Sequence, residues 1–376
     1  MIETGPEALI EHASLRHNLQ VVRGFSPDSR IWAVIKANAY GHDMLKVAQC
    51  LQGADGLAVA RVEEGVHLRD AGISGPILVL EGANFDDELS AAGQHQLELA
   101  VHHQSQIDLF RRQRSDRATR IWLKVDTGMH RLGLPPEAVA QVLQQVQDLG
   151  RRVRLVGVMT HLASADDPHD PFSREQCNAL FALCAGLDLP LSIGNSAGLI
   201  AIPEARTAWV RPGIMLYGAS PLHERTAASL GLRSVMTLKT RLISIQQLRR
   251  GDRIGYGGTY SCPEDMSVGV AAIGYGDGYP RHARQGTPVL VTGRRVPLIG
   301  RVSMDMINLD LRSAPDSAIG DEVVLWGDGL PADEIAAAAG TIPYELFCAV
   351  TARVPRCHID LGESQPQISK ARSKKN

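Results

Sequence analysis

Hydrophobic residues follow two different patterns along this chain, and the change comes at about residue 230. Before it, short apolar runs alternate with longer segments in which apolar residues recur at helical spacing. Eight such runs can be counted, over residues 31–37, 56–60, 76–82, 97–101, 120–126, 153–161, 189–195 and 208–218. Continuous apolar runs are typical of strands buried on both faces, and alternation of strand and helix predicts parallel pairing.

The segments between these runs predict helices over residues 43–52, 61–72, 135–150 and 173–187. Pro135 and Pro136 suit the start of a helix, and Gly150 suits its end. Eight strand–helix units are the number that closes a (β/α)8 barrel. An open, doubly wound sheet is the alternative that the pattern alone allows.

Polar residues at the ends of the apolar runs favour the barrel. They lie at the carboxyl ends of several different predicted strands, which is where barrel enzymes build their sites. These residues are Lys36, Lys124, Asp126, His161, Asn195, Ser196 and Arg211. We therefore predict an N-terminal barrel with a site at the carboxyl ends of its strands.

After residue 230 the helical spacing largely stops. Segments such as VMTLKTRLISIQQL and DEVVLWG alternate apolar and polar residues between Gly, Pro and Asp turns, which predicts a second, mainly β domain. We predict the barrel over residues 1–230 and the β-rich domain over residues 231–362. Residues 363–376 combine low hydrophobicity with a basic end, so we expect a disordered tail there.

The composition argues against several classes of function. The 39 basic and 41 acidic residues give a net charge of −2, which offers no electrostatic reason to expect nucleic acid or a membrane as partner. No apolar stretch approaches the roughly 18–20 residues of a membrane span, and no secretory signal is visible. Six scattered cysteines are typical of reduced thiols. Together these features predict a soluble cytoplasmic protein.

Lys36, at the end of the first apolar run, carries the strongest indication of chemistry. Lysine is rarely buried unless it is paired or chemically used, and burial lowers its pKa toward the range in which the neutral amine attacks a carbonyl. On its own, a lysine at a strand end is more often a snorkelling or salt-bridged side chain. The surrounding string AVIKANAYGHD, however, closely resembles the pyridoxal 5'-phosphate (PLP) attachment motif of the alanine racemases.

This resemblance covers essentially the whole chain except the C-terminal tail. Eight further motifs occur in the family's order, namely KVDTGMHRLG, THLASAD, NSAGL, RPGIMLYG, GYGGTY, AAIGYGDGYPR, GRVSMDM and PYE. The resemblance implies a (β/α)8 barrel followed by a β domain, PLP attached to Lys36, and a homodimer. Position 303 is Ser where some relatives carry Cys, and position 130 is His; neither difference removes a catalytic group.

Racemisation removes the α-proton from one face of an amino acid and returns a proton to the other, so it needs an electron sink and two opposed bases. The resemblance assigns the D face to Lys36 and the L face to Tyr256, which would come from the partner subunit's β domain. A tyrosine among glycines is otherwise usually a packed aromatic or a turn residue. Since a phenol has a pKa of about 10, it must be activated, and the resemblance suggests His161 and Arg211 for this.

The resemblance also assigns the groups that would hold the cofactor. Arg211 would face the pyridine nitrogen and, because arginine only donates, would leave that nitrogen unprotonated and the ring a weaker electron sink. The phosphate would be bound by short donors, namely Ser196, Tyr40, Tyr344 and the main chain of Gly213 and Ile214. Without the resemblance, Arg211 would be interpreted as part of a surface turn and Ser196 as an ordinary helix N-cap.

For the substrate carboxylate, the resemblance assigns Arg131 and the main chain of Met304, the latter from the other subunit. Tyr275 would line a narrow entrance. Lys124 matches a lysine that is carbamylated in some relatives, although Asp126 could share its strand face and simply pair with it. The acidic and histidine residues of segment 161–170 fit no metal-site spacing, so no metal is expected.

The sequence thus predicts interconversion of L- and D-alanine, which would supply D-alanine for peptidoglycan. The alternatives are a racemase of broader specificity that also accepts serine or other small amino acids, and a catabolic alanine racemase. A PLP-dependent decarboxylase should carry an acidic residue in place of Arg211. A non-catalytic PLP-binding barrel should lack the β domain and with it any equivalent of Tyr256.

Overall fold

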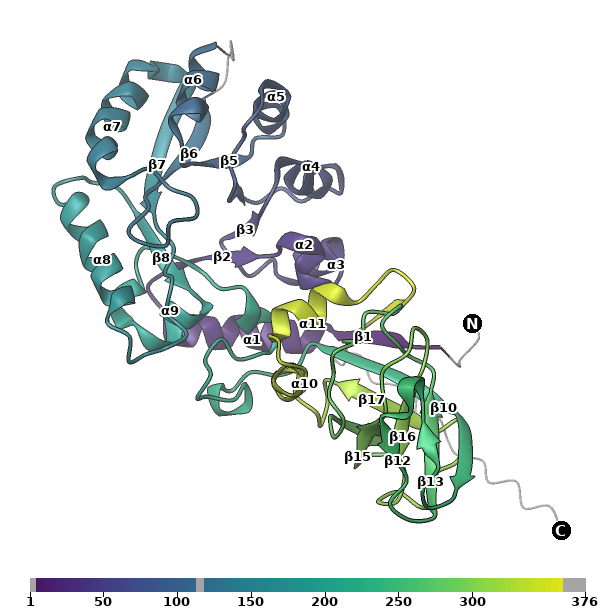
Figure 1. Ribbon diagram of the computed structural model, residues 1–376. Coiled ribbons are helices and arrows are strands. Elements are labelled where there is room, and N and C mark those ends of the chain that lie inside the picture. Colours follow the sequence, from purple (N-terminus) through teal and green to yellow (C-terminus); the bar gives the residue numbers. More distant parts are fainter. Residues whose placement is uncertain (1–4, 113–117, 361–376) are drawn as a thin grey trace.

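The computed structural model describes residues 5–112 and 118–360 and shows a closed barrel of eight parallel strands beside a mainly β domain (Figure 1). The barrel strands are β2 (Arg30–Val34), β3 (Gly56–Val59), β4 (Ile77–Val79), β5 (Glu98–Val101), β6 (Thr119–Lys124), β7 (Val153–Met159), β8 (Leu191–Asn195) and β9 (Trp209–Arg211). Each overlaps one of the eight predicted runs. The predicted barrel is therefore confirmed and the open sheet is wrong. The predicted tail, residues 363–376, lies outside the described residues.

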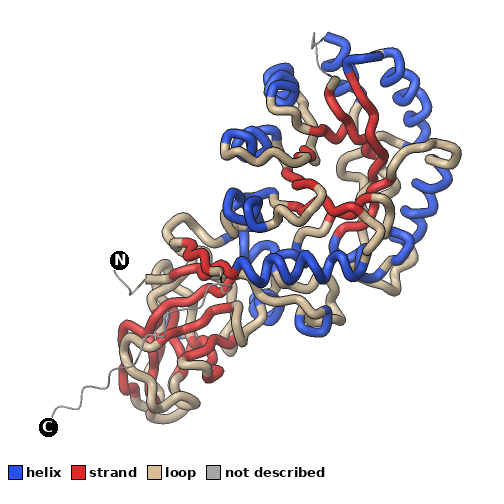
Figure 2. Tube along the Cα trace, turned by 180° about the vertical axis from the view of Figure 1, so that it is seen from behind, coloured by secondary structure: helices blue, strands red, loops and turns tan. Residues whose placement is uncertain are grey.

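Helices cover the outside of the ring of strands (Figure 2). They are α1 (His12–Phe25), α3 (Met44–Cys50), α4 (Val62–Asp70), α5 (Asp86–Gln94), α6 (Gln104–Arg112), α7 (Val139–Asp148), α8 (Phe172–Leu183) and α9 (Ser196–Ala201). The four predicted helices correspond to α3, α4, α7 with the 3-10 turn η1 (Pro136–Ala138), and α8. Strands β3 and β5 are buried at every position, because helices cover one face and the barrel interior the other.

Three tryptophans, from the neighbouring strands β2 and β9 and from the distant strand β6, fill part of the barrel interior. Trp32 stacks on Trp209 at 4.3 Å between ring centroids, and Trp122 meets Trp32 edge-on at 6.2 Å. Glycines make room for these rings, since a Cβ at Gly56 would lie 2.2 Å from the Trp32 ring and a Cβ at Gly157 would lie 2.3 Å from the Trp122 ring. The interior is thus a packed core rather than a channel.

The second domain is mainly β, as predicted. Its eight-stranded sheet has the order β13-β16-β15-β14-β17-β10-β1-β18. The bounds are β1 (Glu7–Glu11), β10 (Met236–Leu248), β13 (Met266–Ala271), β14 (Pro288–Val291), β15 (Arg294–Ile299), β16 (Ile307–Asp310), β17 (Glu322–Trp326) and β18 (Arg356–Ile359). A hairpin of β11 (Arg253–Ile254) and β12 (Tyr260–Ser261) and the helices α10 (Ala332–Ala339) and α11 (Pro343–Ala349) complete it.

Strand β1 comes from the other end of the chain. It pairs antiparallel with β10 and parallel with β18, and α1 of the barrel begins at the next residue. Residues 7–11 therefore belong to the sheet of the β-rich domain, and the barrel begins directly after them. The chain passes between the two domains twice, near residue 11 and near residue 230. No helix in the two described ranges has both the length and the apolar character needed to cross a membrane.

Candidate functional site

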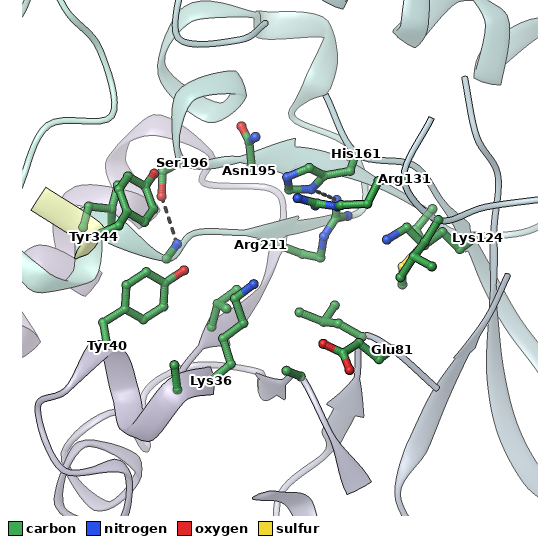
Figure 3. A pocket seen from close by; sticks show the side chains of 18 of the residues that line it. Lys36, Tyr40, Glu81, Lys124, Arg131, His161, Asn195, Ser196, Arg211 and Tyr344 are labelled. Carbon is green, nitrogen blue, oxygen red and sulfur yellow. Dashed lines mark hydrogen bonds between the residues drawn. The ribbon is translucent and has the colours of Figure 1, made fainter. Parts of the chain in front are cut away.

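A pocket of about 530 Å³ opens at the carboxyl ends of the barrel strands. Its lining includes ten of the thirteen predicted site residues, namely Lys36, Tyr40, Lys124, Arg131, His161, Ser196, Arg211, Gly213, Ile214 and Tyr344 (Figure 3). The other three, Tyr256, Tyr275 and Met304, do not line it. The strand-end positions thus converge on one cavity of a size suited to a cofactor and a small substrate.

Lys36 begins a turn of unusual handedness. The short element α2 (Lys36–Tyr40) is left-handed, with φ of 53° at Ala37, 53° at Asn38, 54° at Ala39 and 52° at Tyr40. A left-handed helical backbone costs roughly 1–2 kcal/mol per residue for side chains other than glycine. Four such residues in succession persist only where the surrounding structure holds them in place.

A buried histidine and a partly buried arginine hold the far end of this turn. The ring Nδ1 of His42 lies 3.1 Å from the Ala39 carbonyl oxygen and 2.8 Å from that of Tyr40. Burial lowers the pKa of His42 to about 4, so the ring is neutral and Nδ1 donates to these carbonyls. Arg356, on β18, donates through Nε to the Gly41 carbonyl at 3.0 Å. The β-rich domain therefore helps to hold the lysine turn.

Arg211 ends β9 and is buried below the pocket. Its Nη1 donates to the carbonyl of Ser192 at 2.7 Å and to the Ser192 hydroxyl at 2.6 Å, and its Nη2 donates to the carbonyls of Thr160 at 2.5 Å and Ile193 at 3.1 Å. Burial lowers the pKa of Arg211 to about 10, so it stays charged at neutral pH. Among the described residues, Arg211 forms hydrogen bonds through Nη1 and Nη2, so its Nε–H is the donor available to a ligand.

His161 lies beside this arginine. Its Nδ1 is 3.5 Å from Nη2 of Arg211, the contact drawn dashed in Figure 3. Burial, followed by the positive charges of Arg211 and its neighbours, holds the pKa of His161 well below the usual 6.5. The ring is therefore neutral. Because arginine only donates, Nδ1 accepts and Nε2 carries the proton.

Hydroxyl groups gather at one end of the pocket. The rings of Tyr40 and Tyr344 are 5.8 Å apart, and a Cβ at Gly213 would lie 2.3 Å from the Tyr40 hydroxyl. Burial raises the pKa of both phenols, that of Tyr344 to about 12, so both stay protonated. Ser196 accepts from the Gly213 N–H at 2.9 Å, so this predicted phosphate donor is engaged with Ser196 here.

Lys124 ends β6 with its side chain buried. Burial, followed by the positive charges of neighbouring arginine and lysine side chains, lowers the pKa of Lys124 to about 8. Asp126, the alternative partner, instead accepts from two main-chain N–H groups of its own loop and pairs with the His130 ring at 3.2 Å. In the described ranges Lys124 forms no ion pair, so the structure does not show the alternative pairing with Asp126.

This lowered pKa makes stability depend on pH. Between pH 8 and 10.5 the unfolded chain keeps a proton on Lys124 that the folded chain has lost, so stability rises with pH across this window, by a total of roughly 3 kcal/mol from this group. Lys124→Met should flatten that rise. Thermal denaturation of both proteins without ligands, in buffers freed of carbon dioxide, provides the measurement; parallel curves would contradict the shift.

The pocket also contains two side chains that the sequence analysis missed, Glu81 and Cys348. Glu81 is the one carboxylate among the described lining residues, and it shares the pocket with four basic side chains, Lys36, Lys124, Arg131 and Arg211. It is the second-last residue of the third apolar run, 76–82, so the preference for polar residues near strand ends that selected Lys36 could have found it. The excess of positive charge favours a ligand that carries phosphate and carboxylate groups.

Tyr256, Tyr275 and Met304 lie on the β-rich domain with their side chains in solvent. Their exposed fractions are 72%, 39% and 53%. The loops carrying Tyr275 and Met304 are paired, since the main-chain N–H of Tyr275 donates to the Ser303 carbonyl at 3.0 Å and that of Gly276 to the Met304 carbonyl at 2.9 Å. One chain therefore presents these groups on a surface separate from its own pocket.

The histidines and acids of segment 161–170 do not converge. Asp166 pairs with His223 at 3.2 Å and His169 with Glu224 at 3.7 Å, all of them substantially exposed. Among the residues that the structure describes, no three His, Cys, Asp or Glu side chains are grouped so as to hold a metal ion. The chemistry of the pocket instead rests on lysine, arginine, histidine and hydroxyl groups.

The fold and the site define a class of protein: a (β/α)8 barrel joined to a β-rich domain, with a lysine in a cationic pocket at the carboxyl ends of its strands. Residues 10–221 match the family described as "Alanine racemase, N-terminal domain", and residues 235–358 match "Alanine racemase, C-terminal domain". The chain belongs to the alanine racemase family.

Individual relatives agree over nearly full length. The chain is 53% identical over 351 residues to an alanine racemase from Nitrosococcus oceani, covering 93% of this chain and 98% of the relative. It is 44% identical over 358 residues to one from Coxiella burnetii, covering 94% and 98%. Among solved structures, a biosynthetic alanine racemase from Pseudomonas aeruginosa has a TM-score of 0.92 at 42% identity, covering 95% of this chain and 99% of that one.

Proposed function

We propose that this chain interconverts L- and D-alanine with PLP bound to Lys36, and that it supplies D-alanine for peptidoglycan. The observation that carries the proposal is the pocket itself. One cavity joins a strand-end lysine, a cluster of hydroxyl donors at one end, and cationic side chains suited to a small carboxylate. Family membership favours the same reaction.

The residues present fit PLP. Lys36 would hold the aldehyde carbon, and Tyr40, Ser196, Tyr344 and the main chain near Ile214 would hold the phosphate. Arg211 would donate to the pyridine nitrogen through Nε, the N–H that its five contacts to the protein leave free. When bound, PLP supplies the electron sink that weakens the bond between Cα and its hydrogen.

Two residues of the chain would move protons at Cα. Lys36 would take or return the proton on the D face, and Tyr256 of the partner subunit would do so on the L face. His161 offers the means of activating that phenol, since its Nε2–H can donate to the phenol oxygen and stabilise the phenolate. The fixed charge of Arg211, through its contact with Nδ1, keeps the ring in the tautomer that can donate.

The substrate carboxylate would bind Arg131, with the main chain of Met304 from the partner subunit. Lys124 would support that arginine as a carbamate. A neutral amine attacks CO2 to form the N–C bond and releases one proton, and a pKa of about 8 makes the neutral amine accessible near neutral pH. The carbamate would place a negative charge among the other three basic side chains, Lys36, Arg131 and Arg211.

The incomplete pocket of one chain supports the proposal of a homodimer. Its pocket contains one of the two proposed bases, while Tyr256, Tyr275 and Met304 are exposed on its β-rich domain. We propose that two chains join so that each completes the other's pocket, with Tyr275 narrowing the entrance.

Two alternatives make different demands on the site. A PLP-dependent decarboxylase needs a carboxylate against the pyridine nitrogen, and the proposal assigns that position to Arg211, which donates to the carbonyls of Ser192 and Thr160. A non-catalytic PLP carrier needs no second domain. Here the second domain exposes Tyr275 and Met304 on two loops that are hydrogen-bonded to each other. Both observations favour racemisation.

The proposal predicts a ranking of substrates. Incubation with L-alanine, L-serine and L-lysine, each followed by chiral chromatography, should show alanine converted fastest, and lysine slower by at least about tenfold because a narrow pocket discriminates against extra methylene groups. Equal rates for all three would favour a broad-specificity racemase. Release of carbon dioxide without formation of the D-enantiomer would refute racemisation.

A further inference from the structure

The left-handed turn α2 is held at its start by a carboxylate from a different strand–helix unit. Glu64, in the first turn of α4, accepts a hydrogen bond from the Ala37 N–H at 2.7 Å through Oε1. Its Oε2 accepts from the N–H of Ala60 at 2.7 Å and of Arg61 at 3.2 Å. One carboxylate therefore joins the residue after Lys36 to the end of the neighbouring barrel strand, β3.

The handedness of this turn decides where two side chains of the pocket point. Lys36 stands at its start and Tyr40 at its end, and both line the cavity (Figure 3). Residues four apart share a face in a helical turn of either hand, but a right-handed turn starting at Lys36 would coil in the opposite sense and carry Tyr40 away from its present place in the pocket lining. The end of the turn has His42 and Arg356 to hold it, whereas the start has Glu64.

We propose that Glu64 is a positioning residue, whose charge keeps the Ala37 N–H in the left-handed turn and so aims Lys36 and Tyr40 at one bound molecule. This inference rests on the proposed function, in which Lys36 holds PLP and Tyr40 its phosphate. A hydrogen bond to an ionised acceptor is stronger than one to a neutral amide oxygen. The negative charge of Glu64 should therefore strengthen its hydrogen bond to the Ala37 N–H.

The plainer interpretation is that Glu64 only caps α4. The chain supplies a matched case of that role in Glu88, which occupies the same position in α5. Each glutamate accepts from the N–H four residues before it, at 2.7 Å for Ala60 and 2.6 Å for Asn84. The described hydrogen bonds of Glu88 stay within the start of its own helix, whereas Glu64 reaches 27 residues back to Ala37.

The experiment compares Glu64→Gln with Glu88→Gln. Each enzyme is purified with its cofactor, stripped, and titrated with PLP while the absorbance near ~420 nm is followed. Both substitutions should lower the melting temperature of the stripped protein, because both remove a capping charge. Glu64→Gln alone should weaken PLP binding about tenfold or more, the size expected when a charged hydrogen-bond acceptor is lost.

Activity measurements add a second readout. With PLP saturating, Glu64→Gln should lower kcat while KM for alanine changes little, because the lysine is misdirected and the carboxylate-binding groups are intact. If Glu64→Gln and Glu88→Gln bind PLP with equal affinity, the positioning role is wrong. If the unaltered chain itself binds no PLP, the proposed function fails instead, so the two failures are distinguishable.

Glycine at position 37 tests the argument from strain. Ala37 is exposed, so Ala37→Gly leaves no cavity, and glycine adopts positive φ without steric cost. Adding Ala37→Gly to Glu64→Gln should therefore restore most of the lost PLP affinity. Absence of any recovery would contradict the role assigned to the left-handed turn.

Discussion

Replacing Lys36 with alanine is expected to abolish both the colour of the enzyme and its activity. The purified unaltered protein should be yellow, with an absorbance near ~420 nm that borohydride removes, if Lys36 holds PLP as proposed. Lys36→Ala should lack this absorbance. Racemisation should fall by roughly 10³-fold or more, since the substitution removes at once the attachment point and one of the two proposed bases.

The matched control is Lys46→Ala. Lys46 lies on α3, ten residues further along the chain, and is exposed to solvent outside the pocket. Its loss should leave absorbance and activity unchanged. A Lys36→Ala protein that keeps the borohydride-sensitive absorbance would show that another lysine carries the cofactor, and Lys124, the other lysine of the pocket, would then be the first to examine.

The barrel could be predicted because each of its strands is a run of consecutive apolar residues, which is visible in the sequence. A strand buried on both faces needs an unbroken apolar run, and all eight runs became strands of one closed ring. The pocket could be predicted in part for the same reason. The carboxyl ends of parallel strands meet at one end of a barrel, so Lys36, Lys124, His161 and Arg211 had to converge.

The handedness of α2 could not be predicted. Its sequence, Lys-Ala-Asn-Ala-Tyr, contains good formers of right-handed helix and no glycine. What reverses it are contacts with Glu64, His42 and Arg356, and the last of these is more than 300 residues away. The strand β1 is similar, because a five-residue stretch gives no sign that it pairs with β10 and β18.

Replacing Tyr256 with phenylalanine should separate cofactor binding from racemisation. Tyr256 is 72% exposed in the single chain, so the loss of one hydroxyl should not disturb folding. The protein should keep its absorbance, while racemisation falls by roughly 10²–10⁴-fold, the contribution expected of a general base. Tyr260→Phe, in the same hairpin, is the control and should retain activity.

Isotope exchange then shows which face has lost its base. In deuterium oxide, Tyr256→Phe should still exchange the α-hydrogen of D-alanine, through Lys36, but should exchange that of L-alanine far more slowly. If exchange were lost equally from both enantiomers, the assignment of Lys36 to the D face and Tyr256 to the L face would be wrong. If the variant kept full activity, Tyr256 would have no part in the mechanism.

Mixing two inactive variants tests whether the tyrosine serves the other chain. Let Lys36→Ala and Tyr256→Phe subunits be dissociated and reassociated together. If each pocket takes its lysine from one chain and its tyrosine from the other, every mixed dimer has one intact pocket, so random pairing should restore about one quarter of the unaltered activity. If the tyrosine served its own chain, the mixture would stay inactive. The converse mixture, unaltered chain with the Lys36→Ala/Tyr256→Phe double variant, should lose activity beyond dilution, because each of its mixed dimers has no intact pocket.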